Sequence, residues 1–157
     1  MLNYKVFGAT IAAYLSMMPN LALSQVILTV TNQEASTKFT HEELSSLPQV
    51  VLLTANDYVD QPTSFQGPLL RSVLEASGIG RDAKLNMIAL NDFTSTVPAS
   101  DAFDYDVILA ILREGKTMPV REKGPVWVIY PMDENPELRN DLYNDRLVWQ
   151  LKEISVE

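Results

Sequence analysis

Cysteine is absent from all 157 residues. This absence excludes disulfide bonds, thiolate metal ligands, disulfide redox chemistry and a cysteine nucleophile. Histidine occurs once, as His41, and it falls in the first turn of an expected helix, where a surface role is favoured over that of a ligand or base. No His, Asp or Glu grouping has the spacing of a zinc site, and no nucleophile and base pair of a hydrolase stands out. We therefore expect no catalytic residues and no metal ligands.

Positive charge is also scarce. Twelve basic residues stand against twenty acidic ones, which gives a net charge of −8 and argues against a general affinity for nucleic acid or anionic membranes. The length suits one domain, and 46% hydrophobic with 20% charged residues is typical of a globular protein.

Long apolar runs are missing except near the N-terminus. Lys5 precedes an apolar stretch from Val6 to Met18, and small residues precede a cleavage point before Gln25. Residues 1–24 are therefore interpreted as a secretory signal peptide, too short in its apolar part to cross a bilayer comfortably; an uncleaved anchor is the alternative. Cleavage removes only Lys5 among the charged residues, so residues 25–157 carry −9 and no stable membrane insertion is expected. Export without disulfides favours a periplasmic location.

The mature chain alternates short strands with a few short helices. A capping box from Thr40 to Glu43 predicts a helix that ends at Leu47-Pro48, and a second helix is expected over Leu69–Ala76 with Pro68 at its first position. Strands are expected at 25–31, 50–54, 85–90, 107–113, 126–130 and 147–156. The last of these strands is expected to have a bulge between Lys152 and Glu153. Loops are expected at 32–38 and 55–66, and a solvated segment at 132–144. This order predicts a single α+β domain with a mixed sheet.

Polar residues directly follow the expected strand at 85–90. Asn91, Asp92 and Phe93 stand where a strand ends and backbone amides become free, a common position for ligand-binding side chains. A plain turn is the alternative, because Asn and Asp side chains bond readily to their own backbone.

A second candidate segment runs from Met118 to Pro131. Gly124 and Pro125 precede an apolar run that is expected as a strand. Arg121 and Lys123 would therefore lie just before the start of that strand, with Trp127 close by. A basic rim beside an indole suits a flat polar ring. The alternative is a solvated loop that leads to a core tryptophan.

Several segments in order resemble one family. Ser64–Gly78 (SFQGPLLRSVLEASG), Ile88–Phe93, Leu109–Pro119 and the later Lys123-Gly-Pro and Val148–Ile154 pieces are similar to motifs of the sulfite-oxidase-type molybdopterin-binding domain. The resemblance covers residues 39–157, and it implies a mixed-sheet α+β domain of that type for residues 25–157.

Two departures from that family bear on function. Its enzymes bind molybdenum through a cysteine thiolate, for which this chain has no residue, and the arginine that follows the Lys123-Gly-Pro position is also missing. The chain instead looks like small exported relatives that bind free pterins. The resemblance then implies a non-catalytic, periplasmic pterin-binding protein, without molybdenum, that signals ligand state to the periplasmic domain of a membrane protein, such as a cyclic-di-GMP cyclase/phosphodiesterase or a histidine kinase.

Six residues are the expected ligand contacts. Asn91 and Asp92 would pair with the 2-amino-4-oxo edge of a pterin, Phe93 or Trp127 would stack on its ring, and Arg121 and Lys123 would face its oxygen atoms. Phe93 and Trp127 suit the core equally well. Two alternatives remain: a molybdopterin-dependent oxidoreductase with an atypical metal site, and a ligand-free periplasmic interaction module.

Overall fold

The computed structural model describes residues 24–157, so the predicted signal peptide lies outside the described residues except for Ser24. Within this range, none of the helices combines the length and apolar character needed to cross a bilayer. The strands are β1 (Val26–Thr31), β2 (Ser36–Thr40), β3 (Gln49–Asn56), β4 (Val59–Pro68), β5 (Lys84–Ala89), β6 (Thr94–Pro98), β7 (Ile108–Ala110), β8 (Leu112–Arg113), β9 (Lys116–Thr117), β10 (Trp127–Ile129) and β11 (Leu151–Val156). The helices are α1 (His41–Ser46), α2 (Leu70–Ala76), α3 (Ser100–Asp104) and α4 (Asp141–Asn144), with 3-10 turns η1 (Val120–Glu122) and η2 (Pro136–Leu138).

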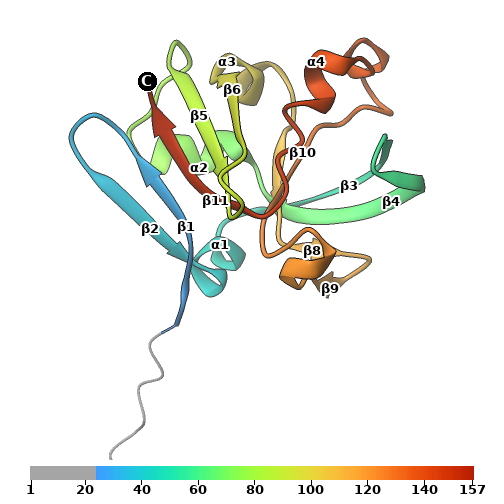
Figure 1. The fold of residues 1–157 in the computed structure, drawn as a ribbon, viewed down its shortest axis with the longest axis horizontal. Helices are drawn as coiled ribbons and strands as arrows, with labels where there is room; N and C mark the ends of the chain where they lie inside the picture. Colours follow the sequence, from blue (N-terminus) through green and yellow to red (C-terminus); the bar gives the residue numbers. More distant parts are fainter. Residues whose placement is uncertain (1–23) are drawn as a thin grey trace, which may run out of the picture.

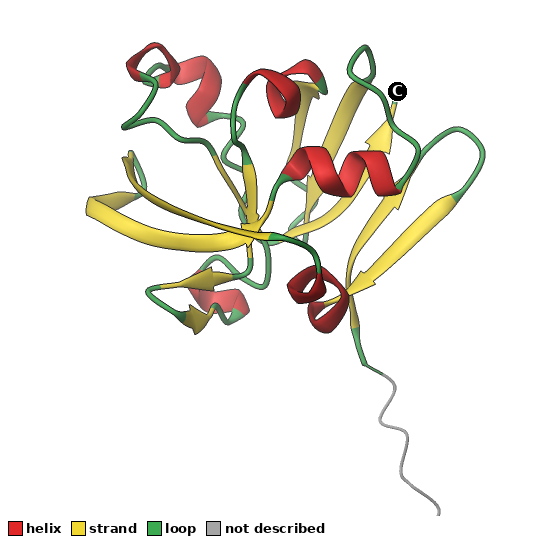
Figure 2. Ribbon diagram, turned by 180° about the vertical axis from the view of Figure 1, so that it is seen from behind, coloured by secondary structure: helices red, strands yellow, loops and turns green. Residues whose placement is uncertain are grey.

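The strands form one large sheet and two smaller ones (Figure 1). The five-stranded sheet has the order β2-β1-β11-β5-β6, in which β1 and β11 pair in parallel and the other neighbours are antiparallel. The four-stranded sheet has the order β3-β4-β8-β9, and β10 pairs with β7. Figures 1 and 2 show the long β3–β4 hairpin reaching away from the five-stranded sheet. The predicted mixed-sheet α+β architecture is confirmed.

The predictions that depend on contacts between residues close in sequence are confirmed. Thr40 and Glu43 form both hydrogen bonds of the capping box, and α1 ends at Leu47 as predicted. Gly78 takes a φ of 70° directly after α2 and its C-cap, a conformation that glycine adopts without strain. The register of β11 against β5 shifts between Leu151 and Glu153, which confirms the predicted bulge.

Six expectations are wrong because strand pairing and packing override local pattern. The strand expected at 107–113 is divided between β7 and β8 in different sheets, and the strand expected at 147–156 begins only at Leu151. The segment 32–38 was expected as a loop, but Ser36–Thr40 is strand β2, paired with β1. The segment 55–66 was also expected as a loop, but most of it belongs to β4, whose backbone groups pair with β3. Pro68 ends β4, and α2 begins only at Leu70. The segment 132–144 is not fully solvated, because Met132 and Leu138 are buried.

The interior divides into two hydrophobic clusters. The larger cluster lies against the five-stranded sheet and includes Leu28, Leu74, Met87 and Ile154. The smaller cluster lies between the β3–β4 hairpin and the β7–β10 pair, and it consists of Leu52, Phe65, Ile108, Ala110, Met118, Trp127 and Ile129. Trp149 packs against the edge of this smaller cluster, where the interior opens to the surface.

Candidate functional site: an aromatic cleft

The β5–β6 turn carries the first candidate segment. Asp92 adopts a left-handed φ of 65°, and the side-chain oxygen of Asn91 accepts a 3.2 Å hydrogen bond from the backbone N–H of Phe93. Asn91 therefore stabilises the turn through its own backbone, as the alternative interpretation supposed. The same turn leaves Phe93 50% exposed, so its ring is available for a contact with a ligand.

The second turn fixes Lys123 beside a group of aromatic rings. Lys123 adopts a left-handed φ of 73°, and a Cβ atom on Gly124 would lie 1.8 Å from the Met118 carbonyl oxygen, so only glycine fits there. The Lys123 ammonium lies 4.1 Å from the ring centroid of Trp149 and 5.5 Å from those of Tyr58 and Trp127. These are cation–π distances, so the ammonium helps to hold the rings in place.

A cleft of about 170 Å³ lies between the β3–β4 hairpin tip, the β5–β6 turn and the segment after α4. It is lined by Tyr58, Ala89, Asn91, Phe93, Asn144, Asp145, Leu147, Val148 and Trp149. Tyr58 and Trp149 meet edge to face with ring centroids 4.8 Å apart, which fixes one aromatic wall. Since a cavity of about 150 Å³ holds a benzene ring, this open cleft has room for a small flat ring system.

A buried ionic network holds the segment that carries Trp149. Arg146 pairs with Asp101 at 2.5 Å, and the Tyr130 hydroxyl donates to the same carboxylate at 2.8 Å. The Trp127 indole N–H donates to the Leu147 carbonyl at 3.1 Å, and further backbone bonds join Val128 to Val148 and Gln150 to Lys123. Trp149 therefore extends from a backbone that is bonded on both sides.

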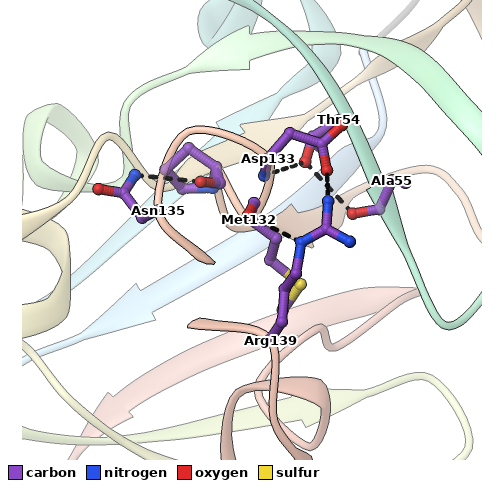
Figure 3. A network of polar contacts seen from close by, with 7 residues as sticks. Thr54, Ala55, Met132, Asp133, Asn135 and Arg139 are labelled. Atoms are coloured by element: carbon purple, nitrogen blue, oxygen red, sulfur yellow. Dashed lines mark hydrogen bonds and ion pairs between the residues drawn. The ribbon is translucent and has the colours of Figure 1, made fainter. Parts of the chain in front are cut away.

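A second network ties the β3–β4 hairpin to the loop after β10 (Figure 3). The backbone N–H of Asp133 donates to the Thr54 hydroxyl at 3.2 Å, and Arg139 bonds both the Asp133 carboxylate and the Met132 carbonyl. At the tip of the hairpin, the side-chain amide of Asn144 donates a hydrogen bond to the Asp57 carboxylate. These contacts keep Tyr58 at the edge of the cleft although it lies on a hairpin tip.

Negative charge gathers on the hairpin side of the cleft. Partial burial, followed by the nearby carboxylates of Asp145 and Asp57, raises the pKa of the Tyr58 hydroxyl above its ordinary value. Tyr58 therefore stays protonated at neutral pH and can donate a hydrogen bond. Asp145 is exposed and lines the cleft, and none of the side-chain hydrogen bonds and ion pairs found among the described residues engages its carboxylate.

The structure brings two of the six predicted residues to the cleft. Asn91 and Phe93 line it, and Lys123 contacts the Trp149 and Tyr58 rings of its wall. Trp127 is fully buried in the smaller core cluster, so it supports the cleft from behind and offers a ligand no face.

The two remaining predicted residues point into solvent. The Asp92 carboxylate is 84% exposed and pairs with Lys152 at 2.6 Å, which lowers its pKa through that hydrogen bond and charge. The Arg121 side chain is 83% exposed, and within residues 24–157 its one ion pair is with its neighbour Glu122. Neither lies among the residues that line the cleft.

Seven of the nine lining residues were not predicted as ligand contacts from the sequence, and four of these have polar or aromatic side chains: Tyr58, Asn144, Asp145 and Trp149. Tyr58 lies in a two-residue turn between two β-rich runs, so recognition of the hairpin would have placed it at an exposed tip. Trp149 shares the alternation of Leu147 and Leu151, which indicated the core rather than a surface. Asn144 and Asp145 carry no local signal, because only packing of α4 brings them to the cleft.

The described residues contain no group of three or more His, Cys, Asp or Glu side chains arranged to hold a metal ion. The full sequence also lacks the cysteine thiolate that binds molybdenum in the family resembled above.

Comparisons with known proteins support the fold. No protein-family model matches the sequence, and no curated protein matches it at a significant level. Among solved structures, the sulfane dehydrogenase SoxCD from Paracoccus pantotrophus matches with a TM-score of 0.58 and 16% identity, over 82% of this chain and 37% of that chain. The chain thus spans little more than a third of that enzyme's length. The domain has the α+β, mixed-sheet fold of the sulfite-oxidase molybdopterin-binding type, without its cysteine.

Proposed function

We propose that this chain is a non-catalytic pterin-binding protein of the periplasm, which reports its ligand state to the periplasmic domain of a membrane signalling protein. The partner would be a cyclic-di-GMP cyclase/phosphodiesterase or a histidine kinase. The observation that carries the proposal is the cleft itself: a space for one flat ring system with aromatic walls, in a chain without a cysteine.

The residues of the cleft fit the chemistry of a free pterin. A ring could stack on Trp149 or Phe93, a contact worth about 0.5–1.5 kcal/mol beyond the burial of its area. The 2-amino and N3–H groups of a pterin form a pair of donors, which a carboxylate accepts in a bidentate fashion. Asp145 has the free carboxylate for this role, and Asn91, Asn144 and the protonated Tyr58 can bond the remaining polar atoms. This assignment replaces Asp92, whose carboxylate is bound to Lys152.

The size of the cleft also separates a free pterin from a larger cofactor. At about 170 Å³ the cleft suits a bicyclic ring that remains partly exposed, and it offers no lining arginine or lysine for a phosphate. Binding of a small ring, rather than turnover, is the role that this set of residues supports.

The proposal is tested by titrating the purified protein with pterin and comparing two matched variants. Asp145→Asn and Asp92→Asn each neutralise one exposed carboxylate. Loss of a charge-assisted hydrogen bond costs about 1.5–3 kcal/mol, so Asp145→Asn should weaken binding roughly ten- to a hundredfold while Asp92→Asn changes it little.

Three other outcomes would count against the proposal. Failure of pterin to bind the unaltered protein at micromolar concentrations, together with a native protein that carries no pterin by mass spectrometry, would favour a ligand-free interaction module. Equal loss in both variants would place the ligand elsewhere. Stoichiometric molybdenum in the native protein would favour an oxidoreductase with an atypical metal site.

A further inference from the structure

The longest sheet edge in the described part of the chain is β3. It has eight residues and pairs only with β4, whereas the outer strands β2, β6 and β9 have five, five and two, and the two members of the β7–β10 pair have three buried residues each. Its pairing with β4 is regular from Gln49 to Thr54, and the register shifts only between Thr54 and Asn56. An edge strand of this kind presents a row of unpaired backbone donors and acceptors.

The other edges carry features that discourage strand addition, and β3 does not. Lys38 lies in β2, Pro98 in β6 and Lys116 in β9, and a charge or a proline on an edge blocks further pairing. The sequence of β3, QVVLLTAN, has no charged residue, proline or glycine. Its Val51 and Leu53 are 61% and 64% exposed, and both project from the face opposite to the buried Leu52.

Charge determines what kind of chain can pair with this edge. Glu42 and Glu43 lie in α1 just before β3, and Asp57 and Asp60 follow it, all of them exposed; the segments 41–48 and 57–61 contain no lysine or arginine. A second copy would bring acidic ends together in either strand direction, since Glu42 and Glu43 lie at one end of β3 and Asp57 and Asp60 at the other, while Arg139 and Lys123 near the hairpin end are engaged by Asp133 and by the aromatic wall of the cleft. A basic segment would instead meet opposite charge at both ends.

We propose that β3 is a docking edge for an extended segment of a partner protein, which adds as a further strand and carries apolar residues at alternate positions flanked by lysine or arginine. The main-chain bonds give affinity, while Val51 and Leu53 pack against the alternate apolar side chains. β3 also leads into the hairpin tip that holds Tyr58, so the edge lies on the same element as one wall of the cleft. The proposal does not depend on the identity of the cleft's ligand.

The test uses a short capped peptide in which lysine and valine alternate. Its binding to the purified protein is followed by NMR, with hydrogen exchange at each backbone amide. We expect slower exchange at alternate amides of β3, about tenfold weaker binding to the Leu53→Lys variant, and unchanged binding to Val26→Lys, which adds the same charge to an exposed valine in β1. Val51→Lys should repeat the effect if Leu53→Lys folds poorly.

Four results would overturn the proposal. The peptide could fail to bind at millimolar concentration, or it could bind without slowing exchange at the amides of β3. A matched peptide of glutamate and valine could bind equally well, which would remove the charge argument. Light scattering could reveal a dimer that Leu53→Lys dissociates, in which case the edge serves a second copy. Pterin binding by the Leu53→Lys variant reports separately on the cleft.

Discussion

Each of the two tryptophans meets another aromatic ring with nearly the same geometry, but the two pairs lie in very different surroundings. Phe65 and Trp127 meet edge to face at 5.2 Å inside the smaller core cluster, whereas Tyr58 and Trp149 meet edge to face at 4.8 Å on the wall of the cleft. The β3–β4 hairpin supplies one ring to each pair. Both tryptophans contribute to packing, but only Trp149 retains a face toward a space that a ligand can enter.

The two indoles differ in whether their contacts are confined to the core. The Trp127 N–H is bonded to the Leu147 carbonyl and its ring is fully enclosed, so all of its contacts serve folding. Trp149 is partly exposed, and its ring contacts Tyr58 and the Lys123 ammonium. The buried pair therefore acts as the support of the exposed one, because the Trp127 hydrogen bond positions the strand segment from which Trp149 extends.

The largest expected effect is a difference in unfolding free energy between alanine variants of the two tryptophans. Trp127→Ala removes a fully buried ring and should cost about 3–5 kcal/mol of unfolding free energy, since it leaves a cavity in the core. Trp149→Ala should cost clearly less, because its ring already contacts solvent. Urea denaturation followed by circular dichroism measures both. Equal losses would show that Trp149 is a core residue and would remove the distinction.

A second substitution tests the ionic support beneath the cleft. Arg146→Ala leaves the Asp101 carboxylate buried without its charge partner, so we expect a loss of about 3–5 kcal/mol. Arg81→Ala breaks an exposed pair with Asp104 and should cost about 0–1 kcal/mol. The comparison is made by urea denaturation at neutral pH. Similar losses for the two variants would contradict a supporting role for the buried pair.

A smaller effect at alkaline pH distinguishes a tyrosine of the larger core cluster, Tyr130, from the cleft tyrosine, Tyr58. Burial, followed by the charge and hydrogen bond of Asp101, raises the pKa of Tyr130 well above its ordinary value, and the pKa of Tyr58 is also raised, mainly by partial burial. The unfolded chain releases these protons near pH 10 while the folded chain retains them. Stability should therefore be unaffected below about pH 10 and fall above it.

The matched variants are Tyr130→Phe and Tyr58→Phe. Tyr130→Phe should flatten the alkaline decline in stability more than Tyr58→Phe, because its hydroxyl is the more deeply buried. The measurement is the unfolding midpoint as a function of pH. If the unfolding midpoint fell more steeply with pH in either variant than in the unaltered protein, the pKa of that tyrosine would not be raised by folding.

The sequence predicted those features that neighbouring residues determine by themselves. The Thr40–Glu43 capping box, the end of α1 at Leu47 and the bulge near Lys152 depend on local contacts or on a change of alternation, and each was found. The fold type followed from the order of motifs along the chain, and the structural match supports it. The strands β2, β4, β6 and β9 were missed, because their polar residues form strands only through pairing with β1, β3, β5 and β8.

The candidate site was predicted only in part, for a related reason. Asn91 and Phe93 follow directly on a strand, so a local argument reached them. Tyr58, Asp145 and Trp149 come together from a hairpin tip and the segment after α4, which are distant in sequence and are joined by packing. Asp92 looked suitable by type, but Lys152, which is 60 residues away in sequence, holds its carboxylate outside the cleft.

The two tryptophans are the only ones in the chain, so their indole N–H signals provide a direct test. In a ¹⁵N-correlated NMR spectrum, titration with pterin should shift the Trp149 indole signal progressively while the enclosed Trp127 signal, bonded to the Leu147 carbonyl, remains nearly in place. No shift in either signal at saturating pterin, or a shift confined to Trp127, would contradict a ligand-binding cleft at Trp149.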